Sequence, residues 1–369
     1  MAQGPHMKFL RTKLRLWIRR ELLALVLVPS VLIVVGATYQ AIALRRDRRR
    51  YPPPGQMVDV GGHRLHLQVT HQDRSGPTVV LEAGLGFPSV EWAWVRKEVA
   101  HFARRVVAYD RAGVAWSESG PKPRDGQRIA EELHAALHAA GIEGSYVLVA
   151  HSFGGLFVRA FADLSPEEVA GMVLVDSSHP DQLERSPLER RAQLRLESMI
   201  KVAPYLARLG VLRLYALSVK WIRELPPEQA AEMRAFVASA EFWVGAGAEA
   251  AAWEESTSPQ VRRARSLGDM PLAVLTAPAT VPFDPVHEEL QAELALLSSN
   301  STHHVVDGAD HGSIVMSPQN ARVVADYVWR VAEAVRTGRP LGAVGSETAV
   351  AAAVGTDARL REDHPKKER

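Results

Sequence analysis

Short apolar runs alternate with longer segments of helical periodicity along most of the chain, from about residue 57 onwards. Most of these runs are continuously apolar, which is typical of strands that are buried on both faces of a mainly parallel sheet. Alternation of such strands with helices predicts an α/β fold. An antiparallel pair around Gly61-Gly62 comes first, and the expected buried strands are residues 78–82, 105–109, 146–150, 171–175, 272–276 and 303–306.

One long stretch interrupts this alternation. Between Pro180 and Asp269 the pattern predicts only amphipathic helices, at residues 182–202, 206–223, 227–240 and 246–255. Because this stretch separates two expected strands of the sheet, we expect an inserted helical cap at about residues 180–268. The end of the chain has no sustained period and is rich in small and charged residues, so we predict a disordered tail over residues 337–369.

The N-terminal part holds an uncharged, mostly apolar run of 23 residues, Leu22 to Leu44. About 20 apolar residues suffice for a helix to cross a bilayer. Basic clusters at both ends of the run suit lipid phosphates better than a protein core. We therefore predict four segments: a basic segment at 1–20, a transmembrane anchor at 21–44, a basic and proline-rich linker at 45–56, and a globular domain at 57–336.

Two other interpretations of this apolar run stay open. It could be a buried core helix, or a signal peptide cleaved near the small residues Ala41-Ile42-Ala43. The orientation of a retained anchor is weakly determined, because six basic residues precede the run and five follow it closely. We favour a membrane protein with a single N-terminal span and an extracytoplasmic domain.

The formal net charge of +2 hides two unlike parts. Residues 1–50 contain 11 Lys and Arg against two acidic residues, which leaves 33 basic and 40 acidic residues and a net charge of −7 for the rest. An acidic body argues against a nucleic-acid partner. The chain has no cysteine, which excludes disulfides, a thiolate nucleophile and cysteine-based metal sites.

Ser152 is the strongest candidate for catalysis. It follows the expected strand at 146–149 and precedes a helix, with the small residues Ala150 and Gly154 on either side, as a tight strand-to-helix turn requires. Such a turn lifts the serine hydroxyl above the sheet and directs the Phe153 N–H towards an oxyanion formed beside it. An ordinary turn serine is the alternative.

With this turn in place, residues 57–335 resemble the α/β-hydrolases of the lipase/esterase-like serine hydrolase type. The resemblance implies an eight-stranded, mostly parallel sheet flanked by helices, an inserted cap, and a triad in the order Ser, acid, His. The matching pieces, in the order of that family, are Leu81-Glu82-Ala83-Gly84-Leu85-Gly86, Val107-Ala108-Tyr109-Asp110-Arg111-Ala112-Gly113, the turn at Ser152, Leu174-Val175-Asp176-Ser177-Ser178-His179-Pro180 and Asp310-His311-Gly312.

The resemblance also implies the partners of Ser152. His311 follows the last expected strand, where this family has its general base. For the acid we favour Asp176, at the end of the strand after the Ser152 helix, and keep Asp284 as the alternative. The family's usual His-Gly pair before the oxyanion loop is Ala83-Gly84 here, so Leu85 N–H is expected to join Phe153 N–H as the second oxyanion donor.

No phosphate-binding loop or H-E-x-x-H motif occurs in the sequence, so we expect no cofactor and no metal. His134 and His138 lie four residues apart on an expected helix and could hold a metal. No third ligand is evident from the sequence, however, and a solvated helix face is the preferred interpretation.

These residues predict a membrane-anchored serine hydrolase that cleaves a carboxylic ester through an acyl-enzyme. Trp92 and Trp94, with several aromatic residues of the cap, favour a small apolar acyl substrate. Lactones, thioesters and amides are other possible substrates, and a catalytically silent binding module is the alternative from another class. Dehalogenases and epoxide hydrolases of the resembled family have aspartate at the position of Ser152, which argues against both activities.

Overall fold

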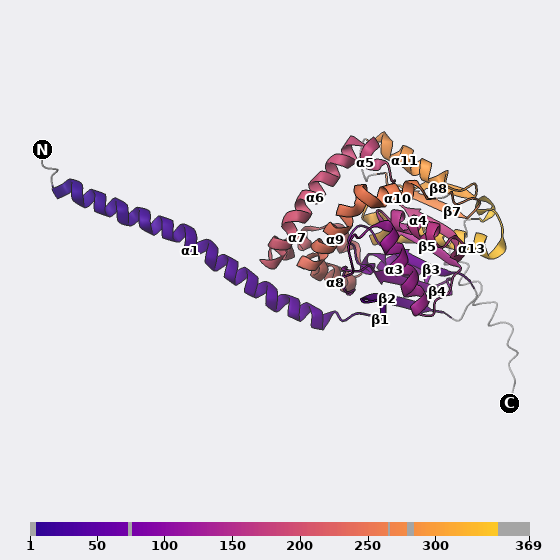
Figure 1. Cartoon of the computed structure of the whole chain (residues 1–369), viewed down its shortest axis with the longest axis horizontal. Coiled ribbons are helices and arrows are strands. Elements are labelled where there is room, and N and C mark those ends of the chain that lie inside the picture. The colour runs from indigo at the N-terminus through magenta and orange to yellow at the C-terminus, as the bar shows by residue number, and fades with distance from the viewer. Residues whose placement is uncertain (1–4, 73–75, 265, 279–283, 346–369) are drawn as a thin grey trace, which may run out of the picture.

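The computed structural model describes residues 5–72, 76–264, 266–278 and 284–345. Within these residues the strands form one eight-stranded sheet in the order β1-β2-β4-β3-β5-β6-β7-β8, with helices packed on it (Figure 1). β1 and β2 pair antiparallel, β2 pairs antiparallel with β4, and the remaining pairs are parallel. This confirms the predicted fold, an eight-stranded, mostly parallel sheet flanked by helices.

The strands coincide closely with the apolar runs of the sequence except at the last, because β8 lies at 301–305 instead of 303–306 and its residues are half-buried or exposed, where a buried strand was predicted. Every residue of β3, β5 and β7 is buried, which explains why these strands read as continuous rather than alternating runs. The strands are β1 Gln56–Asp59, β2 Arg64–His71, β3 Thr78–Glu82, β4 Arg105–Asp110, β5 Tyr146–His151, β6 Val169–Val175, β7 Leu272–Thr276 and β8 Ser301–Val305.

Successive strand residues point to opposite faces of the sheet, and each face has its own core. Val79 and Val147 belong to a core formed with α2 and α13, whereas Val80 and Leu148 belong to one formed with α3 and α4. The helices outside the insertion are η1 Ser89–Trp92, α2 Ala93–Val99, α3 Gly126–Ala139, α4 Gly154–Leu164, η2 Pro166–Glu168, α11 Pro285–Ala295, α12 Ser313–Met316 and α13 Pro318–Thr337.

A helical insertion lies between β6 and β7, in the region predicted for the cap. None of the described residues from 177 to 264 belongs to a strand. Buried residues such as Met233 and Trp243 share one core with the sheet, so the insertion packs on the rest of the domain. Its elements are α5 Gln182–Arg185, α6 Pro187–Arg208, α7 Val211–Ser218, η3 Trp221–Glu224, α8 Pro227–Val237, α9 Ala240–Ala252, the π-helical turn Trp253–Thr257 and α10 Ser258–Arg262.

The N-terminal helix α1, Pro5–Arg50, projects away from the domain (Figure 1). By length and composition alone, it is long and apolar enough to cross a membrane. Residues 13–35 are exposed, but Gln40 is 2% exposed and donates from Nε2 to Ala238 O in the cap, at 2.8 Å. The basic residues 45–50, predicted as part of a linker, instead continue α1, because neither Pro nor Gly occurs between Gly36 and Pro52.

The predicted disordered tail is partly wrong. Residues 338–345 include the short helix η5, Leu341–Ala343, and the side chains of Leu341 and Val344 are buried in the core beside α13. The Leu341 N–H donates to Asn300 Oδ1 at 2.7 Å. Two apolar side chains therefore hold this segment on the domain. Residues 346–369 of the predicted tail lie outside the described residues.

Candidate active site

Ser152 lies on the turn between β5 and α4, with a backbone φ of +55°. Positive φ is uncommon for a residue with a side chain and indicates local strain. The turn is held by a hydrogen bond from Ser152 N–H to Val175 O at 3.1 Å. A Cβ at Gly154 would lie 2.6 Å from Ala83 O, so this position requires glycine.

The structure brings Ser152, His311 and Asp176 together. His311 Nε2 is 2.8 Å from Ser152 Oγ, and His311 Nδ1 is 2.6 Å from Asp176 Oδ2. Ser152 and Asp176 follow β5 and β6, and His311 lies in the loop after β8, so all three come from the carboxyl ends of neighbouring parallel strands. A nucleophile, a base and a group that orients the base are thereby aligned in one chain of hydrogen bonds.

Asp176 is buried and also has positive φ, +45°. Its Oδ1 accepts a hydrogen bond from Ala277 N–H at 2.9 Å and lies 3.1 Å from His287 Nε2. Burial raises the pKa of Asp176, but the hydrogen bonds with His287 and His311 outweigh burial and hold this pKa well below its ordinary range. The carboxylate that faces His311 is therefore ionised.

His287, on α11, is a second histidine at the same carboxylate and was missed in the sequence analysis. Its Nδ1 lies 3.3 Å from Glu189 Oε1 on α6, so the imidazole bridges Asp176 and the insertion. Burial lowers the pKa of His287, but the two carboxylates more than offset burial and raise it to about 10. The sequence offered one signal for His287. It lies in the first turn of the helix after β7, and that turn starts at the carboxyl edge of the sheet, where Ser152 and Asp176 also lie.

Asp284, the alternative acid, lies elsewhere in the hydrogen-bond network. It is the N-cap of α11, where its Oδ1 accepts from Val286 N–H at 3.1 Å, and its Oδ2 accepts from the Ser186 hydroxyl. No contact between Asp284 and His311 occurs in the described part of the chain. The structure therefore gives Asp284 a role at the start of a helix and places Asp176 beside the imidazole.

The two expected oxyanion donors flank the serine in separate loops. Among the described residues, neither Leu85 N–H nor Phe153 N–H donates to a protein acceptor. The neighbouring amides are occupied: Gly84 N–H donates to Glu91 Oε1 at 2.9 Å and Gly86 N–H donates to Glu249 Oε2 at 2.7 Å. The Leu85 loop is thus fixed on both sides of an amide that has no partner among the described residues.

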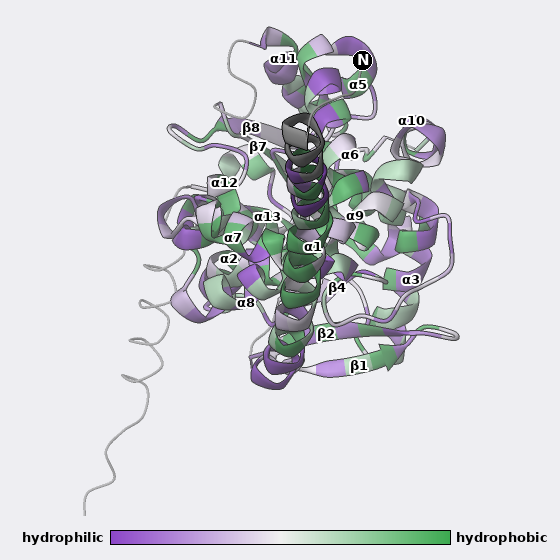
Figure 2. Ribbon diagram, turned by 90° about the vertical axis from the view of Figure 1, so that its left-hand side faces the viewer, coloured by the Kyte–Doolittle hydropathy of each residue, from purple (hydrophilic) through white to green (hydrophobic). Residues whose placement is uncertain are grey.

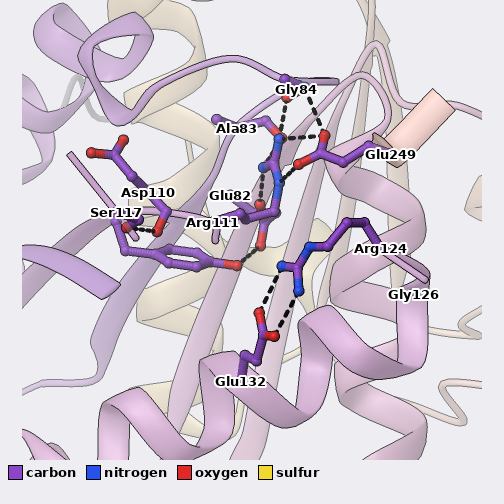
Figure 3. Close-up of polar contacts among 12 residues, drawn as sticks. Glu82, Ala83, Gly84, Asp110, Arg111, Ser117, Arg124, Gly126, Glu132 and Glu249 are labelled. Carbon is purple, nitrogen blue, oxygen red and sulfur yellow. Dashed lines mark hydrogen bonds and ion pairs between the residues drawn. The ribbon is translucent and has the colours of Figure 1, made fainter. Parts of the chain in front are cut away.

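A buried Arg111 holds the same loop from below (Figure 3). Its guanidinium donates to Gly84 O at 2.6 Å, to Glu82 Oε1 at 2.5 Å and to Glu249 Oε1 at 2.7 Å. Burial raises the pKa of Glu82 to about 7, with Arg111 opposing part of the rise. Arg111 contacts the loop rather than Ser152, which gives it a positioning role, and through Glu249 it connects the sheet to α9.

His151, next to the serine, supports the opposite side of the site. Its Nε2 lies 2.8 Å from His311 O, and its Nδ1 lies 3.4 Å from Glu91 Oε1. Burial lowers the pKa of His151, but Glu91 outweighs burial and leaves it raised. A proton on His151 Nε2 allows the ring to donate to the backbone carbonyl of His311, and this contact holds the loop that contains His311.

The tryptophans that were predicted to bind substrate have partners within the protein. Trp92 is fully buried and packs edge-on against His151, and Trp94 Nε1–H donates to Glu224 O at 2.8 Å. Phe87 and Trp221 are better placed to contact a substrate bound at Ser152. Their ring centroids are 5.2 Å apart, and a Cβ at Gly312, next to His311, would lie 2.9 Å from the Trp221 ring. Half-buried aromatic side chains therefore flank the serine–histidine pair.

One group outside the site could hold a metal. The ligand atoms of His134, His138 and Glu168 all lie within 4.8 Å of one another. The expectation that no third residue joins the two histidines is therefore wrong, because folding brings Glu168 of η2 to the end of α3. His138 Nε2 is 2.8 Å from Glu168 Oε1 and His134 Nε2 is 3.5 Å from Glu168 Oε2, so the carboxylate pairs with both rings directly.

Comparison with known proteins gives matches to part of the chain. A family model described as alpha/beta hydrolase fold matches residues 77–237. An esterase of Thermogutta terrifontis has a TM-score of 0.55 at 21% identity, over 75% of this chain and 98% of the esterase. An epoxide hydrolase of Bacillus megaterium has a TM-score of 0.58 at 19% identity, over 75% of this chain and 99% of that chain.

A curated relative, an uncharacterized vacuolar membrane protein of Saccharomyces cerevisiae, is 31% identical over 125 residues. These residues make up 32% of this chain and 19% of the yeast protein. The chain spans about half or less of the length of the curated relatives it matches. At these identities, the solved structures establish the fold.

Proposed function

We propose that this chain, which has the α/β-hydrolase fold and matches a family model of that description over residues 77–237, is a membrane-anchored serine hydrolase that cleaves carboxylic esters. One observation carries the proposal: the continuous chain of hydrogen bonds from Ser152 Oγ through His311 to the buried Asp176. A serine hydroxyl becomes a nucleophile only when such a base takes its proton.

In the first half of the reaction, Ser152 Oγ attacks the ester carbonyl carbon as its proton passes to His311 Nε2. The negative oxygen of the tetrahedral intermediate accepts hydrogen bonds from Leu85 N–H and Phe153 N–H. Asp176 stabilises the imidazolium. The carbon–oxygen bond to the alcohol then breaks, and His311 gives its proton to the departing alkoxide.

In the second half, a water molecule attacks the acyl-enzyme as His311 takes its proton. The same two amides stabilise the second oxyanion, and collapse of this intermediate releases the acid while the proton returns to Ser152. Leu85 N–H and Phe153 N–H serve both halves of the reaction because the negative oxygen occupies the same position in both tetrahedral intermediates.

The surroundings of the serine favour an apolar acyl group or alcohol. Phe87 contacts Trp221 and Phe242, with ring centroids 5.2 Å and 5.9 Å apart, next to the loop that carries Leu85. Apolar surfaces of this kind bind hydrocarbon rather than charged groups. Among acyl substrates we propose an ester first, with lactones, thioesters and amides behind it.

Epoxide opening is disfavoured although an epoxide hydrolase shares the fold. That chemistry uses an aspartate nucleophile in the resembled family, and this chain has Ser152 at the turn. A non-catalytic binding module remains the alternative from another class. A binding module would not require the hydrogen bonds that join Ser152, His311 and Asp176.

For the anchor, we propose that α1 spans a bilayer once and that the domain lies on the extracytoplasmic side. The exposed apolar stretch of α1 supports a membrane partner, because a 38-residue helical segment contains a window with a mean hydropathy of 2.4. The basic residues at both ends suit phosphate headgroups, as the sequence already indicated.

Labelling with a fluorophosphonate probe tests the proposed nucleophile. We expect the full chain in detergent micelles to be labelled covalently at Ser152 and to hydrolyse p-nitrophenyl esters, and Ser152→Ala to lose both. Ser177→Ala is a matched control, since Ser177 is a buried serine close to the same strand ends. Equal labelling of the wild type and Ser152→Ala would refute the nucleophile assignment, and absence of labelling in both would favour the binding module.

A further inference from the structure

The tip of the cap combines exposed apolar and basic side chains. Residues 198–223, from the end of α6 through α7 to Arg223 of η3, contain five Lys and Arg and no Asp or Glu, and the residues that flank this range are Glu197 and Glu224. Leu214 is 72% exposed and Tyr205 69% exposed, far beyond what a packed helix presents to water. We call this surface the docking face; its exposed members are Met199, Lys201, Val202, Tyr205, Arg208, Val211, Leu214, Tyr215, Leu217 and Lys220.

The docking face adjoins the helix that carries the candidate membrane span. A Cβ at Gly36 of α1 would lie 2.6 Å from Leu209 O, and a Cβ at Gly210 would lie 3.3 Å from the Tyr39 ring. Arg213 of α7 donates to Gln40 Oε1 at 2.7 Å. Figure 2 views the molecule from the side on which α1 projects, with its apolar middle in front of the cap. The turn between α6 and α7 is thus in direct contact with α1.

The length of α1 determines how deep in a bilayer its contact with the turn between α6 and α7 would lie. From Leu22, where the uncharged run begins, to Gly36 an α-helix rises about 21 Å. The hydrocarbon core of a bilayer is about 30 Å thick. If Leu22 lies at one boundary of the hydrocarbon core and α1 is perpendicular to the membrane, Gly36 lies about 9 Å inside the opposite boundary. Amphipathic helices that lie in the membrane interface bury their apolar face to about 5–10 Å, which matches this depth.

We propose that the docking face rests in the surface of the bilayer that α1 crosses, and that its natural contact is a lipid surface containing anionic headgroups. The apolar side chains enter the acyl boundary, and Lys201, Arg208 and Lys220 lie at the level of the phosphates. This inference rests on the proposed anchor. It also explains why Gln40, within the uncharged run, is satisfied by Ala238 and Arg213: the cap covers the polar group that would otherwise face lipid.

The docking face also leads to the serine. α7 ends at Ser218, and Trp221 of the next element lies beside Gly312 and Phe87 at the mouth of the site. A lipid-dissolved ester can therefore pass from the membrane interface along apolar side chains to Ser152. The substrate class that fits this route is an ester with a long hydrocarbon chain that partitions into membranes.

The absence of cysteine makes a direct test possible. The variants are Leu214→Cys in the docking face and, as a matched control, Leu296→Cys, an 81% exposed leucine at the C-cap of α11, a helix drawn apart from α7 in Figure 1. Each full-length protein is labelled with the environment-sensitive fluorophore NBD and reconstituted into vesicles of phosphatidylcholine and phosphatidylglycerol. Flotation establishes that the protein is in the membrane, and spin-labelled lipids quench any fluorophore that enters the bilayer.

We expect the label at position 214 to shift to shorter wavelength and to be quenched by the spin-labelled lipid, while the label at 296 behaves as in water. Replacing phosphatidylglycerol by phosphatidylcholine should weaken the quenching at 214. Vesicle-bound protein with equal, water-like signals at both positions would overturn the docking face and leave the anchor intact. Protein that fails to float would overturn the anchor and the docking face together. Neither result bears on labelling of Ser152 by fluorophosphonate.

A variant with fewer basic groups distinguishes recognition of anionic headgroups from mere proximity of the docking face to the bilayer. Lys201→Gln combined with Lys220→Gln removes two basic groups outside the active site. We expect quenching at 214 in phosphatidylglycerol vesicles to fall to the level seen with phosphatidylcholine alone, with hydrolysis of a soluble p-nitrophenyl ester unchanged. Unaltered quenching would show that anionic headgroups are not recognised.

Discussion

At the scale of single residues, two of the three proposed catalytic groups stand on strained backbone. Ser152 and Asp176 both have positive φ, a conformation that costs of the order of 1–3 kcal/mol for a residue with a side chain. Each is held by a neighbouring strand, since Ser152 N–H donates to Val175 O and Asp176 N–H donates to Leu275 O at 2.6 Å. The parallel sheet therefore supplies the stability that keeps these side chains above its edge.

The two aspartates considered for the acid should respond differently to the same isosteric change. Asp176→Asn removes the charge that stabilises the His311 imidazolium, so we expect kcat for an ester to fall roughly 10⁴-fold. Asp284→Asn keeps an N-cap acceptor on α11, and we expect kcat to change less than about threefold. Steady-state kinetics of both variants decide this, and a large loss confined to Asp284→Asn would reverse the assignment.

The sequence was sufficient to predict those site residues whose position follows from one local signal. Ser152 and Asp176 each come directly after a buried apolar strand and His311 lies in the loop after β8, and parallel strands bring their carboxyl ends to the same edge. His287 was not predictable in this way, because its contact with Asp176 depends on how α11 packs against the insertion. Likewise, the role of Glu249 on α9 depends on a partner 138 residues away, Arg111.

At the scale of elements, charged side chains of the cap reach into the core and contact residues that support the site. Glu189 of α6 meets His287, and Glu249 of α9 meets Arg111 and the Gly86 amide. Because these contacts are buried, a movement of α6 or α9 changes the surroundings of Asp176 and of the oxyanion loop. The cap and the site are therefore electrostatically connected.

The raised pKa of His287 makes the attachment of the cap depend on pH. In the unfolded chain this histidine has a pKa near 6.5, and in the folded chain about 10, so the folded state holds the extra proton between these values. The stabilisation is complete below about pH 6.5 and is lost as the pH rises through about 10. We expect Tm in detergent to fall from pH 7 to 10, and to fall less in His287→Gln.

The control for this effect is His71→Gln, the same change at an exposed histidine at the end of β2. It should show the pH dependence of the wild type. If His287→Gln and the wild type lose the same Tm over this interval, His287 is not the group that titrates.

The elements themselves were predicted with unequal success. The buried strands were clear, because continuous apolar runs bounded by polar turns leave few alternatives. The end of the anchor was not clear: residues 45–50 were assigned to a linker on charge, although charge does not end a helix. The segment at 338–345 was misjudged because two apolar side chains, Leu341 and Val344, suffice to hold it.

At the scale of the whole molecule, α1 and the domain form one body rather than an anchor and a tethered domain. The proline-rich segment after Arg50 was expected to separate them, yet α1 packs on the cap before that segment begins, through Gly36 and Gln40. Arg213 joins this contact to the end of α1 by an ion pair with Asp47 at 2.7 Å. In the proposed membrane-anchored protein, this packing sets the orientation of the domain on the bilayer.

A larger side chain at position 36 should separate the two parts. A Cβ at Gly36 already lies 2.6 Å from Leu209 O, so Gly36→Leu must displace α1 from the turn after α6. We expect trypsin to cleave the vesicle-bound variant after the arginines at 45–50 several-fold faster than the wild type. Thr38→Leu, on the exposed side of α1, serves as control and should leave the rate unchanged. Equal rates for all three proteins would argue against the contact.

The unbroken α1 has a final consequence for kinetics. An enzyme whose cap is held on the bilayer meets its substrate by lateral diffusion in a plane, so its rate follows the mole fraction of substrate among the lipids and not the amount of substrate per volume of solution. Adding inert phospholipid at a fixed quantity of ester then slows turnover by surface dilution, whereas adding buffer does not. Under the proposed membrane contact, the composition of the membrane takes the place of substrate concentration.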